Sequence, residues 1–220
     1  MRYHSGRMPS PQHAGDEHPA LAEARRVLEV EAAAILSIVG HLDETFVSVV
    51  ELIHASPGRV VTMGLGKSGI ICKKISATMA STGTPSFFLH PAEAIHGDLG
   101  MIVRGDIVLA ISNSGETEEL IRLLPSIKRI GAGIVAITGN PSSSLARGAD
   151  HHLNAAISKE ACPLGLAPTA STTATVTRTT PSPDASSTRR TAWPPLPEGD
   201  RRSVGQHARG LELFDELVLL

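Results

Sequence analysis

Residues 107–111 (IVLAI) constrain the fold more than any other part of the sequence. The run is short, rich in Ile and Val, and bounded by Gly105-Asp106 before it and polar residues after it, which indicates a buried β-strand. The loop 112–117 (SNSGET) follows, and then Leu and Ile recur with helical spacing. A loop between a strand and a helix presents hydroxyls and free backbone N–H groups, which suit a phosphate. The same side chains could instead only cap the helix, and the loop by itself leaves both interpretations open.

The same alternation of strand and helix recurs along the chain. A helix is expected at residues 70–81, and further strands at residues 59–63, 86–89, 133–137 and 153–157. Strands separated by helices imply right-handed crossovers and a mainly parallel sheet. Aromatic residues make up only 3% of the chain, so the core must consist of Val, Ile, Leu and Ala, which suit a sheet covered by helices on both faces. Ligands bind such sheets at the C-terminal ends of the strands, and that edge should carry the loops at Gly64, His90, Ser112 and Thr138.

The two ends of the chain differ from this central region. Residues 1–16 are expected to form a disordered leader, and residues 17–57 two helices, at about 17–39 and 42–55. Residues 58–175 form the strand-and-helix domain. From residue 176 the sequence is dense in Thr, Ser, Arg and Pro and has no hydrophobic period, so we expect residues 176–220 to be an unrelated, disordered tail. Residues 211–220 (LELFDELVLL) could form a short amphipathic helix without a known place to pack.

Charge and hydropathy argue against several classes of partner. The formal net charge of −2 gives no electrostatic case for binding nucleic acid. No apolar run approaches the ~18 residues of a membrane span, and the first residues lack the apolar middle of a signal peptide, so no membrane association is expected. Two cysteines, Cys72 and Cys162, make no disulfide framework, and a reducing, cytoplasmic location is the default.

Residues 64–69 (GLGKSG) allow three interpretations. The glycine spacing fits a dinucleotide-binding loop, but His90 stands at the end of the second strand, where that motif needs an acidic residue. A Walker A loop is excluded because Val61 occupies the position of its first glycine. The third interpretation keeps the glycines for close backbone approach and gives Lys67 the role of a mobile charge that attracts an anion. A solvated lysine remains the alternative, although a lysine at a helix start opposes the helix dipole.

Several titratable side chains follow the predicted strands. His90 and His96 bracket HPAEAIHGDLG and could contact a sugar hydroxyl or a metal, although each alone is more often a packed histidine. Three glutamates, including Glu119, open the helix after the serine loop, where they stabilise its start or where one of them serves as a general base. Glu160 follows the fifth strand, and helix capping does not evidently explain an acidic residue at this position.

Together these segments resemble the sugar isomerase (SIS) domain of arabinose 5-phosphate isomerases. The similar segments, in the order and spacing of that family, are TMGLGKSG, ASTGTPSFFLHPAEAIHGDLGM, AISNSGETEE, AITGNPSSSLARGAD and SKEACPLGLAPTASTTAT. The resemblance implies an α/β flavodoxin-like three-layer sandwich with a five-stranded parallel sheet, usually in a tetramer. It also implies interconversion of D-ribulose 5-phosphate and D-arabinose 5-phosphate through an enediolate, a step toward Kdo and lipopolysaccharide.

The resemblance assigns roles by motif position. Lys67, Glu119 and Glu160 match residues implicated in catalysis, and Ser112, Ser114 and Thr117 would hold the phosphate of the pentose 5-phosphate. The remaining substrate-binding positions are Gly66, Ser68, Gly83, Thr84, His90 and His96. No cofactor is expected, although His90 also matches a contact of an inhibitory divalent metal. An aldose–ketose isomerisation needs a base, stabilised charge at the reacting oxygens and a phosphate anchor, which this set can supply.

The last part of the chain departs from the family. In that family, the segment STTAT is followed by an apolar helix and then by a segment similar to SHPGG, which supplies a catalytic histidine. Two CBS modules come after it. Arg201 falls at the histidine position by count, His207 lies in an unrelated context, and neither SHPGG nor the modules occur here. The alternative function is therefore a catalytically inactive SIS module that binds a phosphosugar or pairs with an intact paralogue.

We hypothesise a reading-frame shift just after Thr175, because the composition changes there to one typical of GC-rich coding sequence read out of frame. The nucleotide sequence tests this. One alternative frame should encode an apolar helix followed by SHPGG, and the hypothesis fails if neither does.

Overall fold

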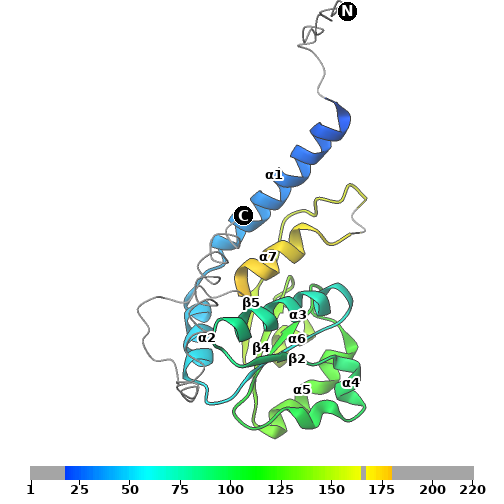
Figure 1. Ribbon diagram of the computed structural model, residues 1–220. Helices are drawn as coiled ribbons and strands as arrows, with labels where there is room; N and C mark the ends of the chain where they lie inside the picture. The colour runs from blue at the N-terminus through cyan, green and yellow to red at the C-terminus, as the bar shows by residue number, and fades with distance from the viewer. Residues whose placement is uncertain (1–17, 165–166, 180–220) are drawn as a thin grey trace, which may run out of the picture. The chain divides into compact units, whose positions relative to one another are not determined.

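The computed structural model describes residues 18–164 and 167–179 of the 220-residue chain. The predicted leader and most of the predicted tail lie outside the described residues. Helices and strands follow one another in the order α1 (Pro19–Val39), α2 (Glu44–Ala55), β1 (Val60–Gly64), α3 (Gly66–Ser81), β2 (Ser86–Phe88), α4 (Pro91–Ile95), the 3-10 helix η1 (Asp98–Met101), β3 (Ile107–Ile111), α5 (Glu118–Ile130), β4 (Gly133–Thr138), α6 (Ser144–Gly148), β5 (His151–Asn154) and α7 (Ala170–Thr179) (Figure 1).

The strands form one parallel sheet in the order β2-β1-β3-β4-β5, which confirms the predicted fold class. β1 pairs with β2 on one side and with β3 on the other, so that Thr62 lies beside both Phe88 and Leu109. The chain thus moves outward from β1 to β2 and then returns past β1 to form β3. This reversal makes the C-terminal ends of β1 and β3 the switch point of the sheet.

Side chains that alternate along the strands build a separate core on each face of the sheet. Val61, Val108 and Ala136 point to the face covered by α4, α5 and α6. Val60, Ile107 and Val135 point to the opposite face, which α2 and α3 cover. Burial of each Val or Ile side chain stabilises the folded state by about 1.5–3 kcal/mol. The alternation of these side chains therefore determines which side of each strand faces which helices.

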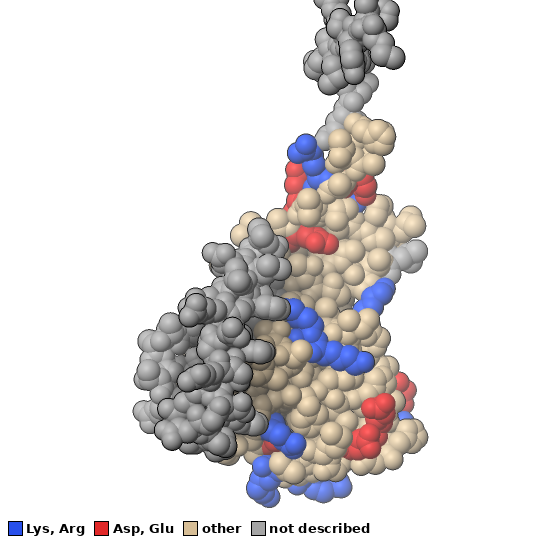
Figure 2. All heavy atoms as spheres, in the orientation of Figure 1, with Lys and Arg blue, Asp and Glu red and all other residues tan. Residues whose placement is uncertain are grey.

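α1 and α7 extend the second face. α7 contacts both α1 and α3, and α1 lies alongside α7 (Figure 1). Leu21, Leu28 and Leu36 of α1 are 58–70% exposed and form an outward apolar stripe. The face drawn in Figure 2 is mostly uncharged, with Lys and Arg scattered among Asp and Glu. Among the described helices, none alone has the length and apolarity of a membrane span; α1 and α2 reach that standard only together, across a bend of 84°.

Three boundaries differ from the sequence-based predictions. α3 begins at Gly66, so the glycine-rich segment forms its first turn and is not a separate loop. β5 covers residues 151–154 and not 153–157, because His151 and His152 pair in register with Val135 and Ala136 of β4. α7 continues to residue 179, past the predicted start of the tail at 176, because it packs on α1 and α3 despite its hydroxyl-rich sequence.

A buried carboxylate ties the N-terminal ends of β1 and β3 together. The Asp106 side chain, fully shielded from solvent, accepts hydrogen bonds from the backbone N–H of Arg59 at 2.8 Å, the Arg59 guanidinium at 2.8 Å and the backbone N–H of Val103 at 3.0 Å. Burial alone would raise the pKa of Asp106, but the hydrogen bonds from Arg59 and Val103 outweigh it and hold the pKa below its usual value. The ionised carboxylate is therefore the form that stabilises the fold.

We expect Asp106→Ala to lower the free energy of unfolding by about 2–4 kcal/mol, because it leaves two backbone N–H groups and a guanidinium without their acceptor. Chemical denaturation at neutral pH measures this. The control is Glu118→Ala, whose exposed pair with Arg122 spans 3.9 Å and should change stability by less than about 0.5 kcal/mol.

The difference between wild type and Asp106→Ala should depend on pH. Because the folded-state pKa lies below the unfolded-state value of ~3.9, the contribution is complete above that value and disappears as the pH falls through the folded-state pKa. Equal stability of the two proteins at neutral pH would contradict this role.

Candidate functional site

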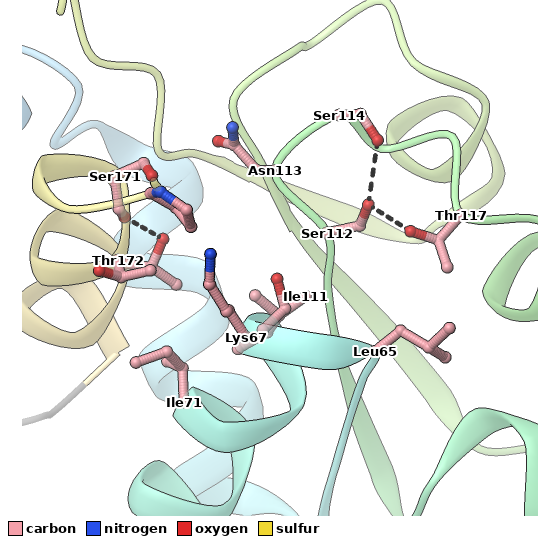
Figure 3. Close-up of a pocket in the computed structure, with 13 residues that line it drawn as sticks. Leu65, Lys67, Ile71, Ile111, Ser112, Asn113, Ser114, Thr117, Ser171 and Thr172 are labelled. Carbon is pink, nitrogen blue, oxygen red and sulfur yellow. Dashed lines mark hydrogen bonds between the residues drawn. The ribbon is translucent and has the colours of Figure 1, made fainter. Parts of the chain in front are cut away.

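A cavity of about 460 Å³ opens at the switch point of the sheet. Its walls come from the loops that follow β1 and β3 and from α7 (Figure 3). The lining residues are Leu65, Lys67, Ser68, Ile71, Ile111, Ser112, Asn113, Ser114, Thr117, Pro168, Ser171, Thr172 and Thr175. The cavity thus lies where ligands bind in open α/β sheets, and its volume is that of a small-molecule site.

Two helix N-termini adjoin this cavity, and neither carries a side-chain cap. α3 starts after Leu65 and α5 starts after Thr117, and no side chain of either residue accepts a hydrogen bond from the first turn of its helix. The first N–H groups of a helix have no partner within the helix, and they carry its positive dipole end. Both ends therefore favour an anion in the cavity.

Glycines allow the close approach of α3 to the sheet at this point. A Cβ on Gly69 would lie 2.7 Å from the carbonyl oxygen of Gly64, closer than two such atoms can come. Gly66 has a φ of 54°, a left-handed conformation that glycine adopts without strain. The glycine spacing that resembles a dinucleotide motif is thus explained by helix–strand packing and the bend into α3.

The serine loop is held by its own hydroxyl groups. Ser112 Oγ lies 2.8 Å from Thr117 Oγ1 and 3.5 Å from Ser114 Oγ, and it accepts a hydrogen bond from the Gly115 N–H at 3.1 Å (Figure 3). Gly115 has a φ of 69°, and a Cβ there would collide with Ser143. The hydroxyl groups of Ser112, Ser114 and Thr117 are thereby gathered at one wall of the cavity.

Lys67 brings positive charge to the cavity. It is the second residue of α3, and its Nζ points into the space between the serine loop and α7 (Figure 3). Among the described residues it is the only charged side chain of the lining, and no described carboxylate lies within ion-pair distance of it. A hydroxyl-lined cavity with one cation and two helix N-termini is suited to a phosphate group.

The glutamates that open α5 have different surroundings. Glu116 accepts a hydrogen bond from the Ser144 N–H at 2.8 Å at the start of α6, and this bond lowers the pKa of Glu116. Glu118 is exposed and pairs with Arg122. Glu119 is half-buried in the first turn of α5, two residues after the lining residue Thr117 and outside the lining itself, and no hydrogen bond or ion pair with another described residue occupies it. Glu119 is thus the free carboxylate of this group.

Glu160 has a structural role that the sequence did not reveal. Its Oε2 accepts hydrogen bonds from the Thr169 N–H at 2.9 Å, the Thr169 hydroxyl at 3.0 Å and the Ser171 N–H at 3.3 Å. The prediction that Glu160 has no reason in helix capping is therefore wrong, because its carboxylate caps α7. Burial alone would raise the pKa of Glu160, but the hydrogen bonds from Ser171 and Thr169 outweigh it and lower the pKa.

The histidines lie on the predicted edge of the sheet but outside the cavity lining. His90 caps α4, with its Nδ1 accepting a hydrogen bond from the Ala92 N–H at 3.3 Å, and its ring packs edge-on against Phe88. His96 is exposed at the C-terminal end of α4. Within the described part of the chain, no three His, Cys, Asp or Glu side chains come together as a metal site. A metal at His90 would therefore need ligands from elsewhere.

Gly83 and Thr84 lie at the opposite edge of the sheet from the cavity. They follow α3, which starts at the cavity and runs back for 16 residues, or about 24 Å. The next residue, Pro85, accepts a hydrogen bond from the N–H of Val60 at the start of β1. Within one chain, these two predicted substrate positions do not meet the serine loop.

The wall formed by α7 was not among the site residues expected from the sequence. Ser171 and Thr172 line the cavity opposite the serine loop, and Asn113 lines it from the loop itself (Figure 3); Thr175 of α7 is a further lining residue. The hydroxyl-rich run at residues 169–175 is the signal in the sequence that could have indicated this wall. A helix that returns to the switch point after β5 could not be placed without knowing its packing.

Comparisons with known proteins agree with this geometry. Arabinose 5-phosphate isomerase KdsD of Pseudomonas aeruginosa is 55% identical over 153 residues, which cover 70% of this chain and 47% of that protein. The protein of the same name from Escherichia coli K12 is 52% identical over 152 residues, which cover 69% of this chain and 46% of that protein. The chain thus spans about half the length of these curated relatives.

A solved structure and a family model complete the comparison. An E. coli CFT073 protein in complex with arabinose 5-phosphate has a TM-score of 0.70 and 40% identity to this chain, and the match covers 73% of this chain and 86% of that one. The model of the family described as "SIS domain" matches residues 52–180, more than half of the sequence. The chain therefore belongs to the SIS domain family.

Proposed function

We propose that this chain is the sugar isomerase domain of an arabinose 5-phosphate isomerase, which interconverts D-ribulose 5-phosphate and D-arabinose 5-phosphate. The observation that carries the proposal is the hydroxyl-lined cavity, with its single cation and two uncapped helix N-termini. The substrate is taken from the names of the curated relatives and from the arabinose 5-phosphate in the complex of the similar E. coli CFT073 protein.

The phosphate of the substrate is proposed to lie against the serine loop. There Ser112, Ser114 and Thr117 offer hydroxyl groups, and the first N–H groups of α5 are free of side-chain caps. Across the cavity, the backbone at Gly66 and Ser68 and the ammonium group of Lys67 complete the anion site. Hydrogen bonds to a charged group contribute about 1.5–3 kcal/mol each, so a few of them suffice to anchor a phosphosugar.

The isomerisation moves a proton between C1 and C2 of the sugar. We assign the base to Glu119, because it lies in the first turn of α5, the helix whose start adjoins the cavity, and no other described residue occupies its carboxylate. Lys67 and the positive end of α3 would stabilise the negative charge that develops on the enediolate oxygens. His90 and His96 remain proposed contacts of the sugar from the same edge of the sheet.

The setting of the enzyme is part of the same proposal. Cys72 and Cys162 are not joined in a disulfide, which supports a cytoplasmic location, where the reaction would supply Kdo for lipopolysaccharide. The exposed leucines of α1 support a homo-oligomer, proposed to be a tetramer, because large apolar surfaces are seldom left in solvent. An oligomer would also give Gly83 and Thr84 of one copy the opportunity to reach the cavity of another.

The full chain should convert D-arabinose 5-phosphate to D-ribulose 5-phosphate, which proton NMR of the sugar follows directly. Lys67→Met should lower kcat/KM at least ~10-fold, because it removes the one cation of the described cavity lining. Lys74→Met, on the same helix but outside the lining, is the control and should keep wild-type activity. A wild-type chain that binds the phosphosugar without turnover would instead support the inactive SIS module.

Glu119→Gln should lower kcat by about 10²–10⁴-fold while binding of arabinose 5-phosphate is retained, because the amide cannot accept the proton. Steady-state kinetics and calorimetry measure the two effects separately. Glu118→Gln, the adjacent exposed carboxylate, is the matched control. Unchanged turnover in Glu119→Gln would show that another group is the base.

A further inference from the structure

The start of α7 depends on one carboxylate oxygen. All three hydrogen bonds to Glu160 Oε2 come from Thr169 and Ser171, at the beginning of the helix. Glu160 belongs to the segment that leaves β5, so it joins the end of the sheet to a helix that starts ten residues later. The position of α7 relative to the sheet is thereby linked to this side chain.

A second set of hydrogen bonds closes the same connection. Thr169 Oγ1 accepts a hydrogen bond from the Ala161 N–H at 2.9 Å while its hydroxyl donates to Glu160. The carbonyl oxygen of Ala161 in turn accepts a hydrogen bond from the Arg26 guanidinium at 2.6 Å, which comes from α1. The chain at residues 160–161 therefore holds the first turn of α7 on one side and α1 on the other.

α7 faces the cavity with hydroxyl groups and without charge. Ser171 and Thr172 lie on the side of the cavity opposite the serine loop (Figure 3), and Pro168 and Thr175 also belong to the lining. Thr172 donates its hydroxyl proton to the backbone carbonyl of Thr169, so its oxygen can act as an acceptor toward a ligand. With the phosphate at the serine loop, the hydroxyl-bearing end of a pentose phosphate extends toward this wall, and acceptors there suit the hydroxyls of a sugar.

The surroundings of Glu160 do not suit a proton-transfer group. Three donors already occupy one oxygen of its carboxylate. These donors stabilise the ionised form, and the pKa of Glu160 is accordingly lowered although burial opposes this. A carboxylate whose pKa is lowered is a weaker base at neutral pH.

We propose that Glu160 is a positioning residue, which holds α7 so that its cavity-facing side, and Thr172 in particular, selects the sugar end of the phosphosugar. The proposal rests on the proposed function, because it names which part of the substrate this wall contacts. It differs from the role in catalysis that the family resemblance implies for Glu160. The two roles predict different effects of replacing the carboxylate by an amide.

Glu160→Gln and Glu160→Ala separate the two roles. Glutamine keeps a carbonyl oxygen that can accept from Thr169 and Ser171, so it should rescue most of what alanine loses. For Glu160→Ala, the KM of arabinose 5-phosphate should rise at least ~10-fold while the affinity for inorganic phosphate, measured by calorimetry, stays the same. Amide hydrogen exchange in the first turn of α7 should become faster in Glu160→Ala and not in Glu160→Gln. A loss of kcat of ~10²-fold or more in both variants, with unchanged KM, would overturn the proposal.

Thr172→Val provides a second variant that keeps the side-chain shape and removes one hydroxyl. It should weaken arabinose 5-phosphate binding about 3–10-fold without changing the affinity for inorganic phosphate, because one neutral hydrogen bond is lost. If the wild-type chain shows no turnover, calorimetry on the same variants still decides: affinity for the phosphosugar that falls in Glu160→Ala and Thr172→Val supports the wall, and unchanged affinity in both overturns it. The isomerase proposal is tested separately, by the turnover assay of the wild-type chain.

Discussion

The reversal of strand order between β1 and β3 is the constraint on which the rest of the structure depends. Right-handed crossovers send α3 and α5 to opposite faces of the sheet, and their N-termini are left close to each other at its C-terminal edge. The contact of Gly69 with Gly64 keeps α3 near the sheet, and the hydroxyls of the serine loop fix the approach to α5. Two uncapped helix starts therefore share one cavity, and neither could make this site alone.

The carboxylates near the cavity lie outside its described lining, which is therefore positively charged. Acidic side chains are present nearby, yet two of them serve as caps: Glu116 accepts a hydrogen bond from the start of α6, and Glu160 caps α7. Among the described residues, the lining carries Lys67 as its charge and hydroxyl groups as its other main polar feature. The site can therefore bind a dianionic phosphate at one wall and uncharged sugar hydroxyls at the other, with Glu119 left free beside them.

Local sequence signals predicted those parts of the fold and site that depend on local structure. The strand at residues 107–111 was predicted with its correct bounds, and the serine loop and Lys67 line a cavity at the predicted edge of the sheet, because the polar residues directly follow the apolar strands in sequence. Packing between distant segments decided the rest. β5 begins at His151, before the predicted start of the strand, because His151 pairs with Val135 of β4. The capping role of Glu160 depends on a helix that begins ten residues later. Motif position likewise could not show that Gly83 lies at the opposite edge of the sheet.

The measurement that tests this account most directly is a titration of the isotopically labelled chain with arabinose 5-phosphate, followed by backbone amide NMR. The account predicts that the amides of residues 66–68 and 114–120 shift together and most strongly, because both helix starts contact one phosphate. Inorganic phosphate should shift the same amides and leave those of residues 171–175 in place. Amide shifts confined to one of the two helix starts, or centred on residues 83–84, would contradict a shared site at the switch point.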